Sequence, residues 1–330
     1  MTKIYSELFE NADPNKALNS YKTNGAFVLK NVFNKIEINK LRNNLDTLFS
    51  NDGDQRIRNL KESNTKDLEF YLNYFYNQNL LNFFNQVFNK NNNNKNYLLP
   101  PMHFAKNYLP HSKFTRIGGW HRDCGGELNY SECRRLIQND NYYFGKVGIY
   151  CQDNGEYGGG IDVIPKSNND YIKNSYGLSR GTIGVKTLRI AQLISKSFHK
   201  ILSRSKLYHL IFGIEKLNIN QGDVVFFDAR IWHKGSYAFS NIEKNLDYDH
   251  SKLQANIPKS FKKYVLYSHF GNYLGMKSYL TDRDRRSSKN NLKESMNWRD
   301  ELDLVYSNAL LKNCKNYKYE LEELINRIVN

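Results

Sequence analysis

Residues 222–236 read GDVVFFDARIWHKGS, and this stretch indicates the class of fold. The turn at Asn220–Asp223 leads into an apolar run over 224–229 that is typical of a buried strand. Further short strand patterns with turn residues around them cover 25–32, 146–152, 161–165 and 262–270. No helix of a β–α–β unit is evident between them. We therefore predict an antiparallel barrel or sandwich with flanking helices, an α+β protein that is mainly β.

Helical patterns lie on both sides of this strand-rich part. A helix is predicted to begin after Asn34, because Glu37 follows three residues later and the two can form a capping box. Apolar residues spaced by three and four continue this helix to about 48, and they recur over 68–88 and 188–212. Two more helices are predicted over 291–330.

The size and composition of the chain are those of a folded protein. Its 330 residues include 40% hydrophobic and 14% aromatic residues, which suffice for a large core. No Pro/Gly/Ser-rich linker divides it, so we predict a single domain over 1–330. Residues 1–100 would form a mainly helical support, 101–275 the core with a helical insert at about 170–215, and 276–330 the C-terminal helices.

The charge of the chain favours anionic partners. The formal net charge is +15, and no acidic residue occurs from Tyr171 to Ile214, where eight lysines and arginines lie. Three interpretations of the basic helix over 188–212 stay open: a helix packed on the core with a solvated face, a lid, or a docking face for an anionic substrate or membrane surface.

The cysteines and the N-terminus favour a cytoplasmic location. Cys124, Cys133, Cys151 and Cys314 show neither a metal-binding spacing nor a disulfide framework, which is typical of a reduced compartment. The first residues lack the apolar segment of a signal peptide, and no run of 18 apolar residues occurs.

A candidate metal site begins at Trp120-His121-Arg122-Asp123. On a strand, residues i and i+2 point to the same face, so His121 and Asp123 could hold one ion. With eight histidines and one acidic residue in ten, about one such pair is expected by chance. His233, just beyond the buried strand, supplies a third ligand. Two histidines and one carboxylate suit ferrous iron, whereas structural zinc is usually closed by a fourth protein ligand.

Four segments together resemble the phytanoyl-CoA dioxygenase family of 2-oxoglutarate oxygenases. They are NGAFVLKNVFNKIEINKLRNNLDTLF (24–49), WHRD (120–123), NGEYGGGIDVIPKSN (154–168), and GDVVFFDARIWHKGS (222–236) with the strand 263–270. The likeness covers most of 20–275. It implies a double-stranded β-helix (jelly-roll) core, Fe(II) held by His121, Asp123 and His233, and both 2-oxoglutarate and O2 as cosubstrates.

The resemblance also implies residues that hold 2-oxoglutarate, with one departure. Lys263 stands where the family has an arginine that pairs with the distal carboxylate, and lysine offers a point charge without the bidentate fork. Ser236 resembles a family serine that binds the same carboxylate, although one extra residue separates it from His233. The segment 237–260 is longer than in the family, so either register could shift.

Other candidates follow from their positions in the sequence. Lys106 on a strand before the metal motif could face the cosubstrate, although a surface or core role is the simpler alternative. Tyr150 and Gln152 could both line the barrel interior, where Tyr150 would contact the cosubstrate and Gln152 the substrate. Arg134 and Arg135 follow the metal motif, where they could bind substrate or form a solvated basic pair.

The expected reaction is hydroxylation, or another oxidation, of a small anionic or lipid-linked substrate, with release of succinate and CO2. Asp123 favours oxygen transfer, desaturation or ring chemistry over halogenation, because the halogenating relatives lack this carboxylate. The alternatives are an inactive jelly-roll binding protein, an oxygenase of nucleic acid, and a zinc hydrolase on the same ligands. No nucleic-acid-binding motif accompanies the positive charge.

Overall fold

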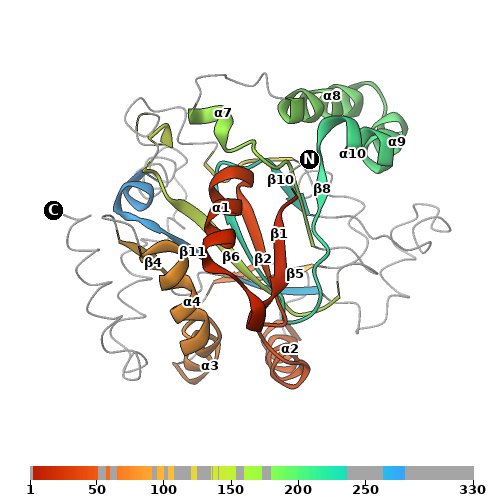
Figure 1. The fold of residues 1–330 in the computed structure, drawn as a ribbon. Coiled ribbons are helices and arrows are strands. Elements are labelled where there is room, and N and C mark those ends of the chain that lie inside the picture. Colours follow the sequence, from red (N-terminus) through yellow and green to blue (C-terminus); the bar gives the residue numbers. More distant parts are fainter. Residues whose placement is uncertain are drawn as a thin grey trace, which may run out of the picture.

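The structure is a computed structural model, and it describes a defined part of the chain. The described residues are 3–50, 57–59, 65–90, 95–99, 103–107, 120–124, 135, 137–139, 141–153, 160–172, 180–235 and 263–278. Helices combine in them with a mixed sheet and an antiparallel sheet, so the protein belongs to the α+β class (Figure 1). More of these residues lie in helices than in strands, so the prediction that the protein is mainly β is wrong.

The larger sheet has eight strands and forms the middle layer of the molecule. Its order is β1 (Tyr5–Leu8), β2 (Ala26–Lys30), β9 (Val224–Asp228), β6 (Phe144–Tyr150), β11 (Lys263–Asn272), β5 (His103–Asn107) and β3 (Ile57–Asn59), and β4 (Asn96–Leu98) also pairs with β11. All pairs except β1–β2 are antiparallel. The strand patterns predicted over 25–32, 146–152, 224–229 and 262–270 correspond to β2, β6, β9 and β11.

A smaller sheet faces one side of the larger one. Its order is β10 (His233–Gly235), β7 (Ile161–Val163) and β8 (Glu215–Lys216), all antiparallel. A buried cluster joins the two sheets, with Val225 and Val265 from the larger sheet against Ile161 and Val163 from the smaller one. Period-two alternation in the strands therefore places one set of side chains between the sheets.

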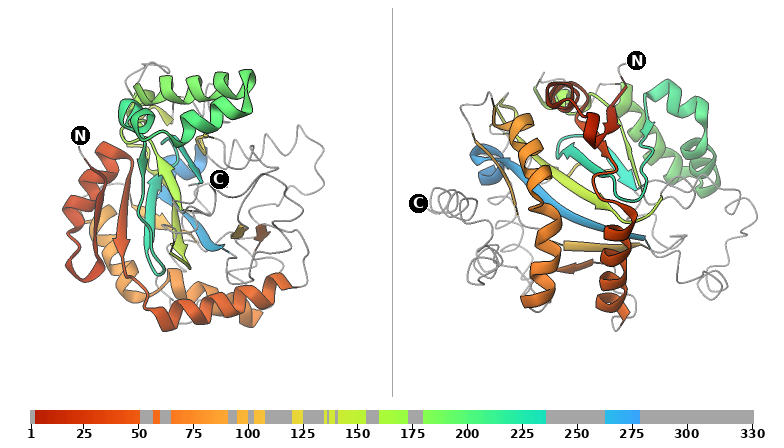
Figure 2. Two further views of the ribbon diagram at one scale, coloured as in Figure 1. Left: turned by 90° about the vertical axis from the view of Figure 1, so that its right-hand side faces the viewer. Right: turned by 60° about the horizontal axis from the view of Figure 1, so that its bottom comes forward.

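Helices cover the opposite face of the larger sheet. They are α1 (Pro14–Asn24), α2 (Lys35–Ser50), α3 (Thr65–Phe75) and α4 (Gln78–Phe88), which lie on one side of it in Figures 1 and 2. The core here is aromatic: Phe88 of α4 lies 4.9 Å, between ring centroids, from Phe270 of β11, and it also contacts Tyr21 of α1. The larger sheet thus separates an aromatic outer core from the cluster between the sheets.

The N-terminal segment corrects one prediction. β1 pairs in parallel with β2 through α1, which is a β–α–β unit at the edge of the sheet, where the sequence analysis expected none. Helix α1 carries ordinary end signals: the Asp13 carboxylate accepts from the amides of Asn15 and Lys16, and Gly25 follows in the left-handed conformation (φ 83°).

The predicted capping box is present, but the next helix is not continuous. The Asn34 amide donates to Glu37 Oε2 (2.7 Å), and Asn34 Oδ1 accepts from the amides of Ile36 and Glu37. The single helix predicted over 68–88 is instead the pair α3 and α4. Asn77 divides them, because its side chain caps the first turn of α4.

The helix predicted over 188–212 is likewise divided. After α7 (Asn169–Ile172), the chain forms α8 (Arg180–Ile194), α9 (Lys196–Arg204) and α10 (Lys206–Phe212), which stand together at one end of the molecule (Figures 1 and 2). Ser195 and Ser205 cap α9 and α10 with their hydroxyls, so each begins a new helix. The helices predicted over 291–330 lie outside the described residues. No helix in the described part is both long and apolar enough to cross a membrane.

Candidate metal centre

Two chain segments that are 112 residues apart in sequence meet at the candidate site. His121 and His233 form an antiparallel bridge, and each backbone amide donates to the carbonyl of the other residue at 3.0 Å. The Asp123 amide donates to the carbonyl of Ala229 at 3.0 Å, which holds the turn after His121 against the connection between β9 and β10. The backbone itself therefore brings the three side chains together.

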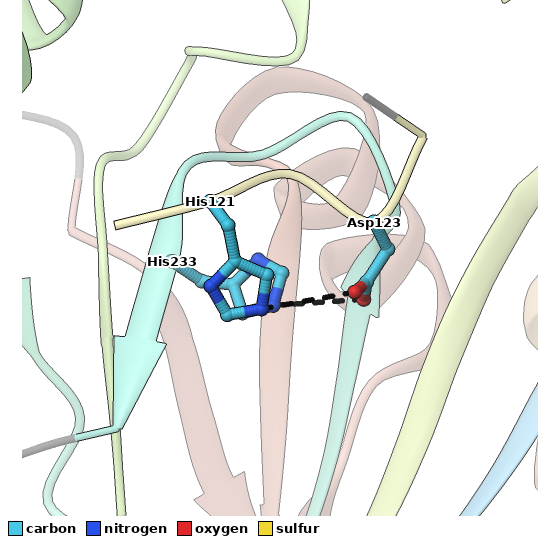
Figure 3. Close-up of side chains that lie close together, drawn as sticks. All are labelled: His121, Asp123 and His233. Carbon is cyan, nitrogen blue, oxygen red and sulfur yellow. Dashed lines mark ion pairs between the residues drawn. The ribbon is translucent and has the colours of Figure 1, made fainter. Parts of the chain in front are cut away.

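The geometry suits a divalent cation. His121 Nε2 lies 3.8 Å from Asp123 Oδ1, and His233 Nε2 lies 3.5 Å from Asp123 Oδ2 (Figure 3). One ligand atom of each residue lies within 4.8 Å of the other two. Atoms that bind the same ion at about 2.1 Å can be at most about 4.2 Å apart, so the three atoms are close to binding distance.

His233 is held in the tautomer that can bind a metal. Its Nδ1 lies 3.1 Å from the carbonyl oxygen of Ile231, so Nδ1 is the protonated nitrogen and Nε2 keeps its lone pair. Burial, together with the nearby His121 and Lys146, lowers the pKa of His233 to about 4, although Asp123 raises it. The imidazole is therefore neutral at pH 7.

Asp123 is ionised and has a cationic neighbour that the sequence analysis did not identify. Lys146 of β6 places its Nζ 3.0 Å from Asp123 Oδ2. Burial by itself would raise the pKa of Asp123, but Lys146, His233 and His121 together lower it well below its usual value. The signal was a lysine in the middle of an otherwise uncharged strand, FGKVGIY.

The three candidate ligands differ in how far solvent reaches them. The side chains of His233 and Asp123 are largely buried, whereas that of His121 is 49% exposed. No fourth His, Cys, Asp or Glu joins the cluster among the described residues. The donor set therefore fits a metal that keeps free coordination positions, as ferrous iron does in oxygenases.

Two arginines and two tryptophans beside the candidate ligands connect the site to α8. The guanidinium of Arg189 donates to the carbonyl of Trp120 (3.0 Å), next to His121, and lies 5.2 Å from the ring of Trp232, next to His233. Arg122 lies 4.5 Å from the same ring and pairs with Asp170 at 2.9 Å. This cluster fixes the residues beside both histidines.

Another buried pair stabilises the connection that precedes His233. Arg230 forms hydrogen bonds to both carboxylate oxygens of Asp228, at 2.7–3.2 Å, and to the carbonyls of Ile137 and Tyr142. The Asp228 amide donates to the carbonyl of Gly25. Asp228 and Arg230 therefore neutralise each other inside the fold, a few residues before the candidate ligand His233.

Tyr150 lies between the two sheets, as predicted. It is fully buried, and its ring meets that of Tyr267 edge to face, with centroids 6.5 Å apart. Burial, and then the neighbouring Tyr267, raises the pKa of Tyr150 well above its usual value, so the hydroxyl stays protonated at neutral pH. Burial raises the pKa of Tyr267 as well, and among the smaller influences Lys146 lowers that pKa and Asp123 raises it.

Of the other predicted residues, Gln152 and Arg135 have side chains in the described part of the chain. Gln152 is buried, and its Oε1 accepts from the Tyr264 amide at 2.7 Å, just beyond the end of β6. Arg135 is exposed. Lys106 and Lys263 lie on β5 and β11, with side chains outside the described part, and Arg134 and Ser236 lie outside the described residues.

No protein-family model matches this chain, and no curated protein matches it in sequence.

Proposed function

We propose that the protein is an Fe(II)- and 2-oxoglutarate-dependent oxygenase. One observation carries the proposal: His121, Asp123 and His233 converge on one point through a backbone bridge, with His233 held in a metal-binding tautomer. Two histidines and one carboxylate with open positions are the ligand set of non-haem iron oxygenases. The order of the motifs resembles that of the phytanoyl-CoA dioxygenase family, which supports the same proposal.

We also propose that the two facing sheets form a jelly-roll core. The ligands support it by their position, because His233 is the first residue of β10 in the smaller sheet and its ring lies 4.9 Å, between centroids, from that of Phe227 in the larger one. The site therefore lies beside the space between the sheets, where jelly-roll proteins of this kind hold their ligands.

Bound iron would supply the oxidation chemistry, and the residues of this chain would position and protect it. His121, Asp123 and His233 would hold the ion. The apolar residues between the sheets exclude water from the inner side of the site. The exposed side of His121 leaves a path for substrate.

For the cosubstrate, we propose two residues that the resemblance implies, Lys263 and Ser236, and two that their positions suggest, Lys106 and Tyr150. Lys263, Ser236, Lys106 and Tyr150 would bind 2-oxoglutarate, and Tyr150 contributes a protonated hydroxyl to the interior beside the ligands. The substrate is proposed to be a small anionic organic molecule, because the chain carries a net charge of +15.

The test combines metal binding with turnover. Under anaerobic conditions the purified protein is expected to bind about one Fe(II), and in air it should release succinate from 2-oxoglutarate. His121→Ala should lose both properties, because it removes one of three ligands, and loss of even an outer-shell partner of a ligand typically costs about tenfold or more in metal affinity. His209→Ala, on α10 and away from the ligands, is the control and should keep both.

Two results would overturn the proposal. Iron binding without any succinate, under all substrate conditions tried, would favour a binding protein. Activity that requires zinc and proceeds without oxygen would favour a hydrolase on the same three ligands.

A further inference from the structure

The helices α8, α9 and α10 carry an unusual concentration of exposed apolar side chains. In the described part of the chain, seven large hydrophobic side chains are more than half exposed, and six of these belong to the three helices. We call these six the insert face: Ile190, Leu193, Ile194, Ile201, Leu207 and Leu210. Isolated apolar residues are normal at a surface, whereas such a concentration marks a contact site.

The insert face is separate from the apolar side chains that hold the helices in place. Val185, Leu188 and Tyr208 are buried against Trp120 and Ile164, next to the metal-site segments. The exposed residues repeat at spacings of three and four, as in Ile190, Leu193 and Ile194, so they form stripes along the helices. Each of α8 and α10 thus buries one apolar stripe and exposes another.

The segment that carries the insert face has only basic charges in its sequence. From Tyr171 to Ile214 there are eight basic residues and no acidic residue. Among the described side chains, Lys186 is exposed one turn before Ile190, and Lys206 is exposed one turn before Leu210. Exposed apolar stripes with flanking lysines are the pattern of helices that lie in the interface of an anionic membrane.

We propose that the insert face docks the protein on the surface of an anionic lipid bilayer. A second copy of the chain fits poorly, because a symmetric contact would place like-charged faces together. A protein partner is less favoured because its contact surface would be centred on Tyr, Trp and Arg, whereas this face consists of Ile and Leu with Lys. The proposal does not depend on the oxygenase function.

The experiment measures co-sedimentation of the full-length protein with vesicles. Binding is expected to vesicles that contain phosphatidylserine, weaker binding to phosphatidylcholine alone, and a decrease as salt concentration rises. The double variant Leu193→Asn/Ile194→Asn should weaken binding by about tenfold or more, because it removes the two most exposed apolar side chains of the face. Ile36→Asn is the control, since Ile36 is 81% exposed on the distant helix α2, and it should bind like the wild type.

A second pair of variants tests the charge. Lys186→Gln/Lys206→Gln should lower the affinity for phosphatidylserine vesicles by about fivefold for each lysine. The exposed lysines Lys16 and Lys35, changed to Gln, should have a smaller effect.

Three outcomes would overturn the proposal. One is the absence of wild-type binding to either vesicle, and another is binding that the Leu193→Asn/Ile194→Asn variant retains in full. The third is a wild-type dimer in solution that this variant converts to a monomer, which would identify the face as a contact between copies.

Discussion

At the scale of single residues, the ion pair between Lys146 and Asp123 defines the charge of the candidate site. The ammonium group neutralises a carboxylate that would otherwise be buried beside two imidazoles. A divalent cation bound to Asp123 would take over part of that role, because it supplies positive charge to the same carboxylate. The ion pair between Lys146 and Asp123 therefore stabilises the protein most when no metal is bound.

Replacement of Lys146 should therefore destabilise the metal-free protein more than the metal-bound protein. Lys146→Met is expected to lower the free energy of unfolding of the metal-free protein by about 1–3 kcal/mol, because it leaves a buried carboxylate without its cation. The rise in melting temperature on addition of Fe(II) should then be larger than in the wild type. Lys30→Met is the matched control, since Lys30 pairs with the buried Asp223 at 2.8 Å away from the ligands. Equal metal-induced shifts in the two variants would contradict this account.

His233 should make the metal-free protein sensitive to acid. Its pKa is about 4 in the folded state, against about 6.5 in an unfolded chain, so between these values the unfolded state binds more protons. This contribution to stability is complete above pH 6.5 and is lost as the pH falls towards 4. From pH 7 to pH 5 the loss should be about 2 kcal/mol.

The measurement is urea unfolding with a chelator present, at pH 7 and at pH 5. His233→Gln lacks the titrating group, so its free energy of unfolding should fall less over this range than that of the wild type. The difference between the two proteins isolates His233 from the other groups that titrate. An identical decrease in both would show that His233 is not held neutral.

At the scale of elements, the close seating of α8 connects the helical insert to the metal site. A Cβ atom on Gly184 would lie 2.7 Å from Cβ and Cγ of Phe212 in α10, and one on Gly181 would overlap with the side chain of Ile164 beside β7. Only glycine allows these approaches, and α8 then places Arg189 against Trp120 and Trp232.

Gly184→Ala should therefore destabilise the protein, although alanine is the better helix former. In an open helix the change would stabilise by about 1 kcal/mol. Here the overlap with Phe212 should reverse the sign and lower the free energy of unfolding by about 1–3 kcal/mol. Gly235→Ala is the control with open space around its Cβ, and it should be close to neutral. Urea titration of both variants gives the comparison, and a stabilised Gly184→Ala protein would refute the packing argument.

At the scale of the whole molecule, the candidate site joins parts of the chain that fold from distant positions. Asp123 and His121 belong to the segment before β6, whereas His233 follows β9 and is the first residue of β10 in the smaller sheet. An ion bound by all three would link the two segments in the folded state only. Metal binding should consequently stabilise the entire domain.

Addition of Fe(II) without oxygen should raise the melting temperature of the wild type. At a free metal concentration about 100 times the dissociation constant, the stabilisation is about 2.7 kcal/mol, enough for a shift of several degrees. Thermal unfolding followed by fluorescence would measure it. The His121→Ala protein should show little of this shift, and an unchanged shift in that variant would place the bound metal elsewhere.

Short-range patterns were sufficient for much of the fold and for the candidate ligands. The buried strand over 224–228 and the capping box at Asn34 and Glu37 depend on neighbouring residues, so they can be predicted without knowledge of the partners. The N-cap Asp13 and the left-handed Gly25 at the two ends of α1 are local signals of the same kind, although the sequence analysis did not predict this helix. The prediction of His121, Asp123 and His233 as one group rested on motif order, and the structure brings them together.

The sequence by itself determined the α+β character and the strands β2, β6, β7, β9 and β11, because these follow from periodicity and residue type, and it indicated the three candidate ligands through the order of the motifs. Only the tertiary structure decided that Lys146 faces Asp123, that β1 runs parallel to β2, and that Arg189 holds the segments beside both histidines. These contacts join residues that are between 22 and 69 positions apart in the sequence. The strands among them could also have paired with other strands. Their geometry is set by sheet register and helix packing, which local sequence does not specify.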